Sequence, residues 1–298
     1  MTHHSNCPLC DSANTGIFLR TSDYFLSGES FELWKCSQCG FVFTYDPPDE
    51  SNIGHYYESD DYLSHNDSAK GFFGIVYRAV RKLMLVRKTG MVRKASGLKT
   101  GEFLDIGSGT GHFLSAMKNS GWRVRGIEIN EKAREYSISE FGLQVLAGDK
   151  VKSLQSQSLN VVTLWHVLEH FNDPFSLAEE IRRIIKPGGV CLIALPNSGS
   201  FDAEHYKEFW AAYDVPRHLW HFEPSTIDLY AKKTGFKVVG TRTLPLDVFY
   251  ISILSEKYKN SALPFITGVI KGLWFAMRSC INKDRCSSLI YFLQRKPE

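Results

Sequence analysis

Residues 102–113 have the sequence EFLDIGSGTGHF, which decides the fold of this 298-residue chain. Phe103, Leu104 and Ile106 form a short apolar run, the pattern of a buried strand. Glycines follow at alternate positions, where they let the backbone turn sharply and approach a ligand closely. The apolar spacing after the glycines predicts a helix. A strand, a glycine-rich turn and a helix are typical of the ligand-binding start of an open α/β sheet, where ligands lie at the carboxyl ends of the strands.

The spacing of these glycines argues against a dinucleotide site. That fingerprint requires G-x-G-x-x-G, but Gly111 comes one residue early and His112 stands where the third glycine belongs. Asp105 also lies at the strand end, where a carboxylate would repel a pyrophosphate and attract a cation. The segment DIGSGTG resembles the first motif of the class I S-adenosylmethionine-dependent methyltransferases. This resemblance implies that Asp105, Gly107, Gly109 and Gly111 bind the cofactor.

Two further acidic residues follow the next two predicted strands. The segment 122–130 predicts a second strand with Glu128 at its end, and 143–149 predicts a third that closes on Asp149. An acid in the first of these positions accepts hydrogen bonds from both hydroxyls of a ribose. We expect the second to accept from an adenine amino group. Strands that alternate with helices in this way indicate a parallel sheet.

Later segments continue the resemblance. WHVLEHFNDP, IIKPGG and ALPN resemble, in order and spacing, the later motifs of small-molecule class I methyltransferases. Trp165 begins the first of these segments, and we assign it to the cofactor site. The whole set predicts a seven-stranded, mostly parallel Rossmann-like sheet that binds S-adenosylmethionine. The remaining strands are expected at 160–165, 190–197, 236–244 and 288–296.

Four cysteines near the N-terminus form two C-x-x-C pairs separated by 25 residues. Paired thiolates at this spacing favour one tetrahedral zinc ion in a ribbon, with Zn²⁺ in a structural role because four thiolates leave no open coordination position. No secretory signal is visible, so we expect a reducing, cytoplasmic compartment in which metal ligation explains the cysteine pairs better than disulfides. The predicted ligands are Cys7, Cys10, Cys36 and Cys39.

Histidines are the candidate catalytic bases. The segment YDVPRHLWHF, residues 213–222, places His218 and His221 between aromatic residues. It resembles the segment after the fifth strand in bacterial methyltransferases similar to the ubiquinone-pathway and carbohydrate-cluster enzymes. Imidazole titrates near neutrality, so either histidine can take a proton from an acceptor. His166, at the rim of the fourth predicted strand, is the competing base.

The same segment supplies the predicted acceptor site. Arg217 is expected to fork onto a carboxylate or phosphate of the acceptor, and we also assign Tyr213 to acceptor binding. The acceptor is predicted to be a small molecule, a sugar or a lipid-linked compound, methylated on oxygen, nitrogen or carbon. An apolar helical insertion at about 245–285 is expected to cap the site, with peripheral contact to a lipid-linked substrate as the alternative. It falls short of the roughly 20 apolar residues that a membrane span requires.

The expected domain organisation has three parts. Residues 1–48 form the zinc ribbon, 49–98 a lid and a helical arm, and 99–298 the methyltransferase domain. Three tyrosines among acids at 55–65 suit a lid. The helical pattern at 68–96 carries cations that we expect to form a solvated face, with contact to an anionic substrate or surface as the alternative.

Two other functions remain open. An RNA base methyltransferase would use the ribbon and the basic arm to bind nucleic acid, but the formal charge of +3 is too small to indicate nucleic acid by itself. A non-catalytic binding protein would keep the ribbon and a degenerate core, although the acids at 105, 128 and 149 argue against this. The chain gives no indication of its oligomeric state.

Overall fold

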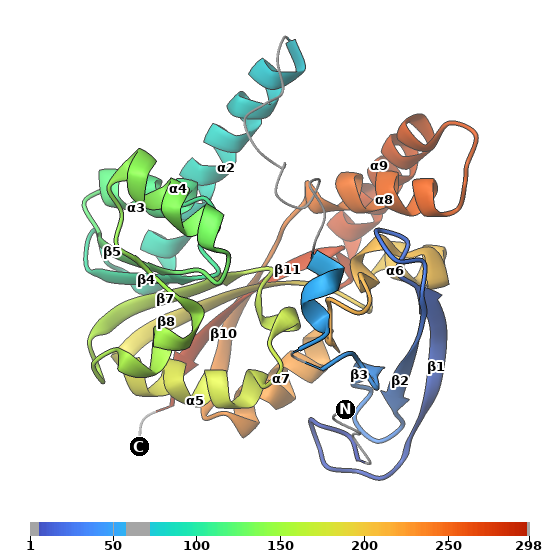
Figure 1. The fold of residues 1–298 in the computed structure, drawn as a ribbon, viewed down its shortest axis with the longest axis horizontal. Coiled ribbons are helices and arrows are strands. Elements are labelled where there is room, and N and C mark those ends of the chain that lie inside the picture. Colours follow the sequence, from blue (N-terminus) through green and yellow to red (C-terminus); the bar gives the residue numbers. More distant parts are fainter. Residues whose placement is uncertain (1–5, 50, 58–71, 297–298) are drawn as a thin grey trace.

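A seven-stranded sheet forms the centre of the protein (Figure 1). The computed structural model describes residues 6–49, 51–57 and 72–296. The strand order is β10-β11-β8-β7-β4-β5-β6; β11 pairs antiparallel with both β10 and β8, and the other neighbouring strands pair in parallel. The predicted mostly parallel α/β sheet is therefore confirmed. Its strands are β4 Glu102–Ile106, β5 Arg123–Ile127, β6 Val145–Leu146, β7 Leu159–Trp165, β8 Ile185–Pro196, β10 Phe236–Thr243 and β11 Ser288–Arg295.

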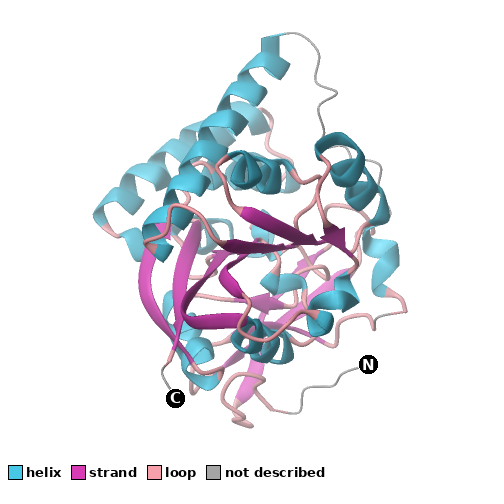
Figure 2. Ribbon diagram, turned by 90° about the vertical axis from the view of Figure 1, so that its left-hand side faces the viewer, coloured by secondary structure: helices cyan, strands magenta, loops and turns pink. Residues whose placement is uncertain are grey.

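Helices cover both faces of this sheet (Figures 1 and 2). On one face Phe103 packs in a core with residues of α2 and α3. On the other face the adjacent residue, Leu104, packs in a second core with residues of α5 and α7. Both faces are apolar, as expected for a parallel sheet with helices on each side. The helices are α2 Phe72–Ser96, α3 His112–Asn119, α4 Glu131–Phe141, α5 Pro174–Ile184, α6 Phe201–Tyr206 and α7 Pro224–Lys233.

The strand order reverses beside β4. The chain leaves β4 toward β5 on one side, and the later strand β7 pairs with β4 on the other. Ligands of open α/β sheets bind at such a switch point, outside the carboxyl ends of the strands. The glycine turn that follows β4 lies at this point.

The N-terminal ribbon is joined to the rest of the fold. Its strands β1 Thr15–Ser22, β2 Ser30–Cys36 and β3 Val42–Tyr45 are extended by β9 Trp220–His221. Val42 pairs with His221 across β3 and β9. Phe41 and Phe43 belong to the same hydrophobic core as β4 and β7. The boundary predicted at residue 48 therefore does not coincide with a break in packing, and it stays a prediction about folding units.

The predicted helical insertion forms a hairpin of two helices, α8 Asp247–Tyr258 and α9 Pro264–Ile281 (Figure 1). Among the described residues, no helix combines the length and the apolar character needed to cross a bilayer. Short 3₁₀ turns complete the structure: η1 Ile53–Tyr57, η2 Gly148–Ser153, η3 Leu168–His170, η4 Lys207–Phe209, η5 Ala211–Tyr213 and η6 Lys283–Arg285.

One sequence prediction, the lid, is only partly covered by the described residues, and another, the third strand, needs correction. The predicted lid at 55–65 is described only to Tyr57, because residues 58–71 lie outside the described part of the chain. The third strand, predicted at 143–149, is confined to Val145–Leu146. The backbone then turns into η2 at Gly148, so a strand prediction that ran to Asp149 was too long.

Candidate active site

The three glycines after β4 have positive φ angles of 71°, 53° and 80°. Such angles favour glycine because it has no Cβ. A Cβ on Gly107 would lie 2.4 Å from the Val167 side chain, and one on Gly111 would lie 2.6 Å from the Ser137 side chain. At Gly109 nothing lies within 4 Å of that position. Gly107 and Gly111 therefore permit close packing, whereas Gly109 leaves the backbone open to a ligand.

Asp105 is buried at the end of β4, where the Thr163 hydroxyl donates to Oδ1 at 2.5 Å. Burial raises the pKa of Asp105 to about 7, against the opposing effects of this hydrogen bond and of the Lys88 charge. A carboxyl group in this condition is ionised more fully when a further cation lies beside it. The predicted attraction for a cationic ligand thus has a physical basis in the site.

Glu128 holds the glycine turn against the end of β5. Its Oε2 accepts from the Gly109 N–H at 2.7 Å, and its Oε1 accepts from the Asn130 N–H at 2.8 Å. A carboxylate oxygen can accept two hydrogen bonds, so each oxygen has capacity for another donor. Glu128 therefore stabilises the glycine turn and is also a candidate acceptor for the ribose hydroxyls. Sequence reasoning missed its contact with the turn.

Ile129 is another residue that sequence reasoning missed. Its side chain is 86% exposed beside Glu128, at the carboxyl edge of the sheet. A Cβ on Gly148 would lie 3.6 Å from the Ile129 Cβ, so the turn after β6 approaches it closely. The side chain of Asp149 lies outside the described part of the structure, and its predicted contact with adenine stays a prediction.

Lys88 of α2 lies against Trp165 at the end of β7. Its Nζ is 4.0 Å from the indole ring centroid and 5.6 Å from that of Phe113, a cation–π arrangement. Burial lowers the pKa of Lys88, while Asp105 and Asp247 oppose that shift. The expectation of a solvated basic face is wrong for Lys88, because its side chain is turned toward the apolar rings. The face of Trp165 therefore already holds a cation.

His166 follows Trp165 and has a φ of 56°, an uncommon conformation for a non-glycine residue. Its Nε2 lies 3.1 Å from an Asp247 carboxylate oxygen, and its Nδ1 lies 3.6 Å from one of Glu169. Burial alone would lower the pKa of His166, but these two carboxylates outweigh it and raise the pKa to about 9. The imidazole is still 37% exposed.

The other candidate bases are enclosed. His218 Nδ1–H donates to the Ala212 carbonyl at 2.9 Å, and His221 Nε2 lies 3.1 Å from the Thr44 hydroxyl. Both side chains are buried. Burial, with the His218 charge, lowers the pKa of His221 to about 3. The structure therefore brings His166 to the carboxyl edge of the sheet and holds His218 and His221 within the contact between segment 213–222 and the ribbon.

Arg217 joins the ribbon to the same segment. Its guanidinium is 1% exposed and donates to Asp23 at 2.7 Å and to Asp214 at 2.6 Å. Tyr213 is also buried, with its ring 5.3 Å from that of His221. These contacts give Arg217 and Tyr213 structural tasks. Their predicted contacts with an acceptor stay predictions.

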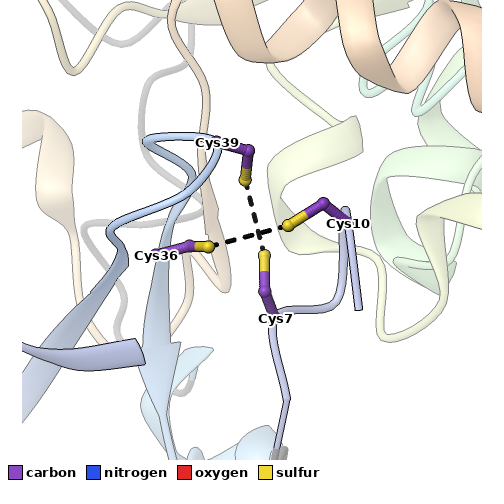
Figure 3. Close-up of side chains that lie close together, drawn as sticks. All are labelled: Cys7, Cys10, Cys36 and Cys39. Carbon is purple, nitrogen blue, oxygen red and sulfur yellow. Dashed lines mark hydrogen bonds between the residues drawn. The ribbon is translucent and has the colours of Figure 1, made fainter. Parts of the chain in front are cut away.

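The four ribbon cysteines point toward one another (Figure 3). Their sulfur atoms all lie within 4.8 Å of one another, with 3.6 Å between Cys7 and Cys39 and 3.6 Å between Cys10 and Cys36. Four thiols at this separation suit a tetrahedral ion. The predicted ligand set is thus assembled in one place.

Comparisons with known proteins extend these observations. A family model described as a methyltransferase domain matches residues 79–241. Ubiquinone biosynthesis O-methyltransferase of Cupriavidus pinatubonensis is 27% identical over 180 residues, which cover 55% of this chain and 72% of that protein. The protein of the same name from Idiomarina loihiensis is 25% identical over 195 residues, covering 61% and 80%. The solved structure of phosphoethanolamine N-methyltransferase 2 from Haemonchus contortus, in complex with S-adenosyl-L-methionine, has a TM-score of 0.54 at 16% identity and covers 95% of this chain and 69% of that chain. This last likeness concerns the fold alone.

Proposed function

The chain belongs to this methyltransferase-domain family and is an S-adenosylmethionine-dependent methyltransferase, and from that premise we propose that it methylates a hydroxyl oxygen of a small-molecule, sugar or lipid-linked acceptor. The observation that carries the proposal is His166, an ionisable group paired with Asp247 beside Trp165 and the glycine turn. The two relatives named O-methyltransferases support oxygen, rather than nitrogen or carbon, as the receiving atom.

The residues at the strand ends fit S-adenosylmethionine. The open position at Gly109 allows a ligand to approach the backbone, and the Glu128 oxygens have capacity for ribose hydroxyls. Ile129 offers exposed apolar surface to the adenine ring. Trp165 lies at the same strand edge, but the Lys88 ammonium group already covers one face of its ring, so the proposed contact of Trp165 with the cofactor involves the rest of the indole.

S-adenosylmethionine supplies a methyl group that is already activated, so the protein contributes alignment and proton removal. In its neutral form, His166 takes the proton from the acceptor hydroxyl. Asp247 and Glu169 then stabilise the imidazolium that forms. Because these carboxylates hold the pKa of His166 near 9 despite its burial, the neutral base is the minor form at pH 7.

The acceptor chemistry is tested with S-adenosylmethionine carrying a ¹³C-labelled methyl group and a panel of hydroxylated, amino and carbon-acid acceptors. The ¹³C shift of the product separates O-methyl from N-methyl and C-methyl groups. We expect an O-methyl signal. Transfer only to nitrogen or carbon would contradict the proposal.

A first prediction concerns cofactor binding. Glu128→Ala should weaken S-adenosylmethionine binding by about 1.5–3 kcal/mol, because it removes a charge-assisted hydrogen-bond acceptor and the brace of the glycine turn. Calorimetry measures this loss, and Glu131→Ala, an exposed acid at the start of α4, is the control. Unchanged affinity in Glu128→Ala would remove Glu128 from the cofactor site.

The proposal also includes a structural zinc ion on the four cysteines and a cytoplasmic location. The cysteine arrangement supports the zinc ion. The RNA-modifying and non-catalytic alternatives have no better support from the comparisons.

A further inference from the structure

Helix α9 packs on α8 through its smallest residues. A Cβ on Gly268 would lie 2.5 Å from the Ile253 Cα, and one on Gly272 would lie 2.9 Å from the Phe249 side chain. The two backbones are therefore in near contact, and a larger residue at either glycine would separate them. Close packing through small residues four positions apart leaves the bulkier side chains of α9 on its other faces.

The opposite face of α9 carries most of its bulky apolar residues, whereas Phe275 is buried on the packed side. Six of them are each between 50% and 64% exposed: Phe265, Ile266, Ile270, Leu273, Trp274 and Met277. Their spacing of three and four residues places them along one side of the helix. A helix in water normally buries such a face and exposes its small and polar residues. Here the order is reversed, and the exposed stripe is continuous along the helix.

Cations outnumber acids around this stripe, with Glu256 and the exposed Asp284 as the flanking acids. Residues 257–283 contain five cations and no aspartate or glutamate. Lys271 pairs with Glu256 of α8 at 2.6 Å, which neutralises it. Lys257, Lys259, Arg278 and Lys283 are exposed. Aromatic and aliphatic residues on one face with cations beside them are typical of helices that lie in a membrane interface.

We propose that the α8–α9 hairpin binds the surface of an anionic lipid bilayer, with the apolar stripe of α9 inserted among the head groups and the flanking cations facing lipid phosphates. A second copy of this chain suits the stripe less well, because a twofold contact would bring two sets of like charges together. The helix lies in the plane of the interface, since Lys271 and Arg278 interrupt its apolar sequence.

The hairpin is also connected to the candidate active site. Asp247, the first residue of α8, contacts His166. The proposed bilayer contact is therefore made by the same hairpin that supplies Asp247 to the candidate base His166. The proposal does not depend on the acceptor chemistry, since vesicle binding is measured without a methyl acceptor.

The test uses co-sedimentation of the full chain with vesicles of phosphatidylethanolamine and phosphatidylglycerol. The triple variant Phe265→Ser, Ile270→Ser, Trp274→Ser removes the centre of the stripe. A matched control replaces three exposed apolar residues elsewhere, Ile138→Ser, Leu229→Ser and Val239→Ser. We expect the wild type and the control to bind, and the vesicle affinity of the stripe variant to fall by at least about tenfold. Circular dichroism and S-adenosylmethionine binding verify that each variant is folded.

A second arm tests the charges: Lys257→Gln, Lys259→Gln, Lys283→Gln should weaken binding to the same vesicles and leave the fold intact. Wild-type protein that stays in the supernatant, or a folded stripe variant that binds as tightly as the wild type, would overturn the proposal. Sedimentation equilibrium tests the alternative that a second copy of the chain binds to the stripe. A wild-type dimer that the stripe variant converts to a monomer, without vesicle binding, would assign the stripe to a second copy of the chain.

Discussion

His166 and His221 have the same side chain but lie in contrasting surroundings. His166 lies at the end of β7 between two carboxylates, which raise its pKa to about 9 although burial opposes them. His221 lies in β9, and burial, with the His218 charge, lowers its pKa to about 3. One histidine is cationic at neutral pH and partly exposed, whereas the other is neutral and enclosed. The difference indicates that charged partners can outweigh burial in setting the pKa of a histidine.

The largest expected effect follows metal removal, which should loosen the ribbon sheet that contains His221 and leave the central sheet beside His166 intact. A structural zinc site contributes apparent binding energy of about 10–16 kcal/mol in zinc-finger peptides, and that energy is coupled to folding. Chelation should raise hydrogen exchange in β1–β3 and in β9, which pairs with β3, while β4, β7 and S-adenosylmethionine affinity barely change. Purified protein should contain one zinc ion per chain. If elemental analysis finds none in protein prepared without chelator, the zinc assignment fails.

The next effect is kinetic. His166→Ala should lower turnover by roughly 10²–10⁴ with little change in S-adenosylmethionine affinity, because it removes the base and leaves the cofactor contacts. His221→Ala is the comparison variant, which should lower thermal stability and leave the turnover of the folded fraction nearly intact. Single-turnover rates with calorimetric cofactor affinities distinguish the two. The reverse pattern would assign the catalytic base to the segment 213–222.

The smallest effect is a displacement of the pH–rate profile. The rate should rise with pH and level off above about 9 as His166 loses its proton. In Asp247→Asn the amide no longer stabilises the imidazolium, so the pKa of His166 falls and the midpoint moves to lower pH. Asp284→Asn, an exposed acid in η6, is the control. Identical midpoints in the wild type and Asp247→Asn would show that Asp247 does not tune the base.

The central sheet could be predicted because its signals are local. A strand, its turn and its helix at residues 102–119 are specified by neighbouring residues, and the structure confirms each of them. The pairing of β3 with β9 could not be predicted. It joins Val42 to His221 across most of the chain, and two residues carry too little pattern to indicate a strand.

In the candidate site, too, some residues could be predicted from local sequence and others could not. Asp105 lies near the end of β4 and Glu128 directly follows β5, and the sequence marks both strand ends, so their positions could be predicted. Arg217 looked like an anion-binding residue because one of its partners, Asp23, is remote in sequence, although the other, Asp214, lies only three residues earlier. Lys88 looked solvated because the periodicity of a basic helix does not reveal that Trp165 lies opposite one of its cations. In both cases a long-range partner, which local pattern does not reveal, contributes to the observed environment.

The most direct test of the contrast between the two histidine regions is an NMR titration of the protein labelled with ¹⁵N and ¹³C in histidine. Signals are assigned by their loss in His166→Gln and His221→Gln. The account predicts that the His166 signal titrates near pH 9 and that the His221 signal stays neutral down to the acid limit of folding. A neutral His166 at pH 7, or a His221 that titrates near its ordinary pKa in the folded protein, would contradict it.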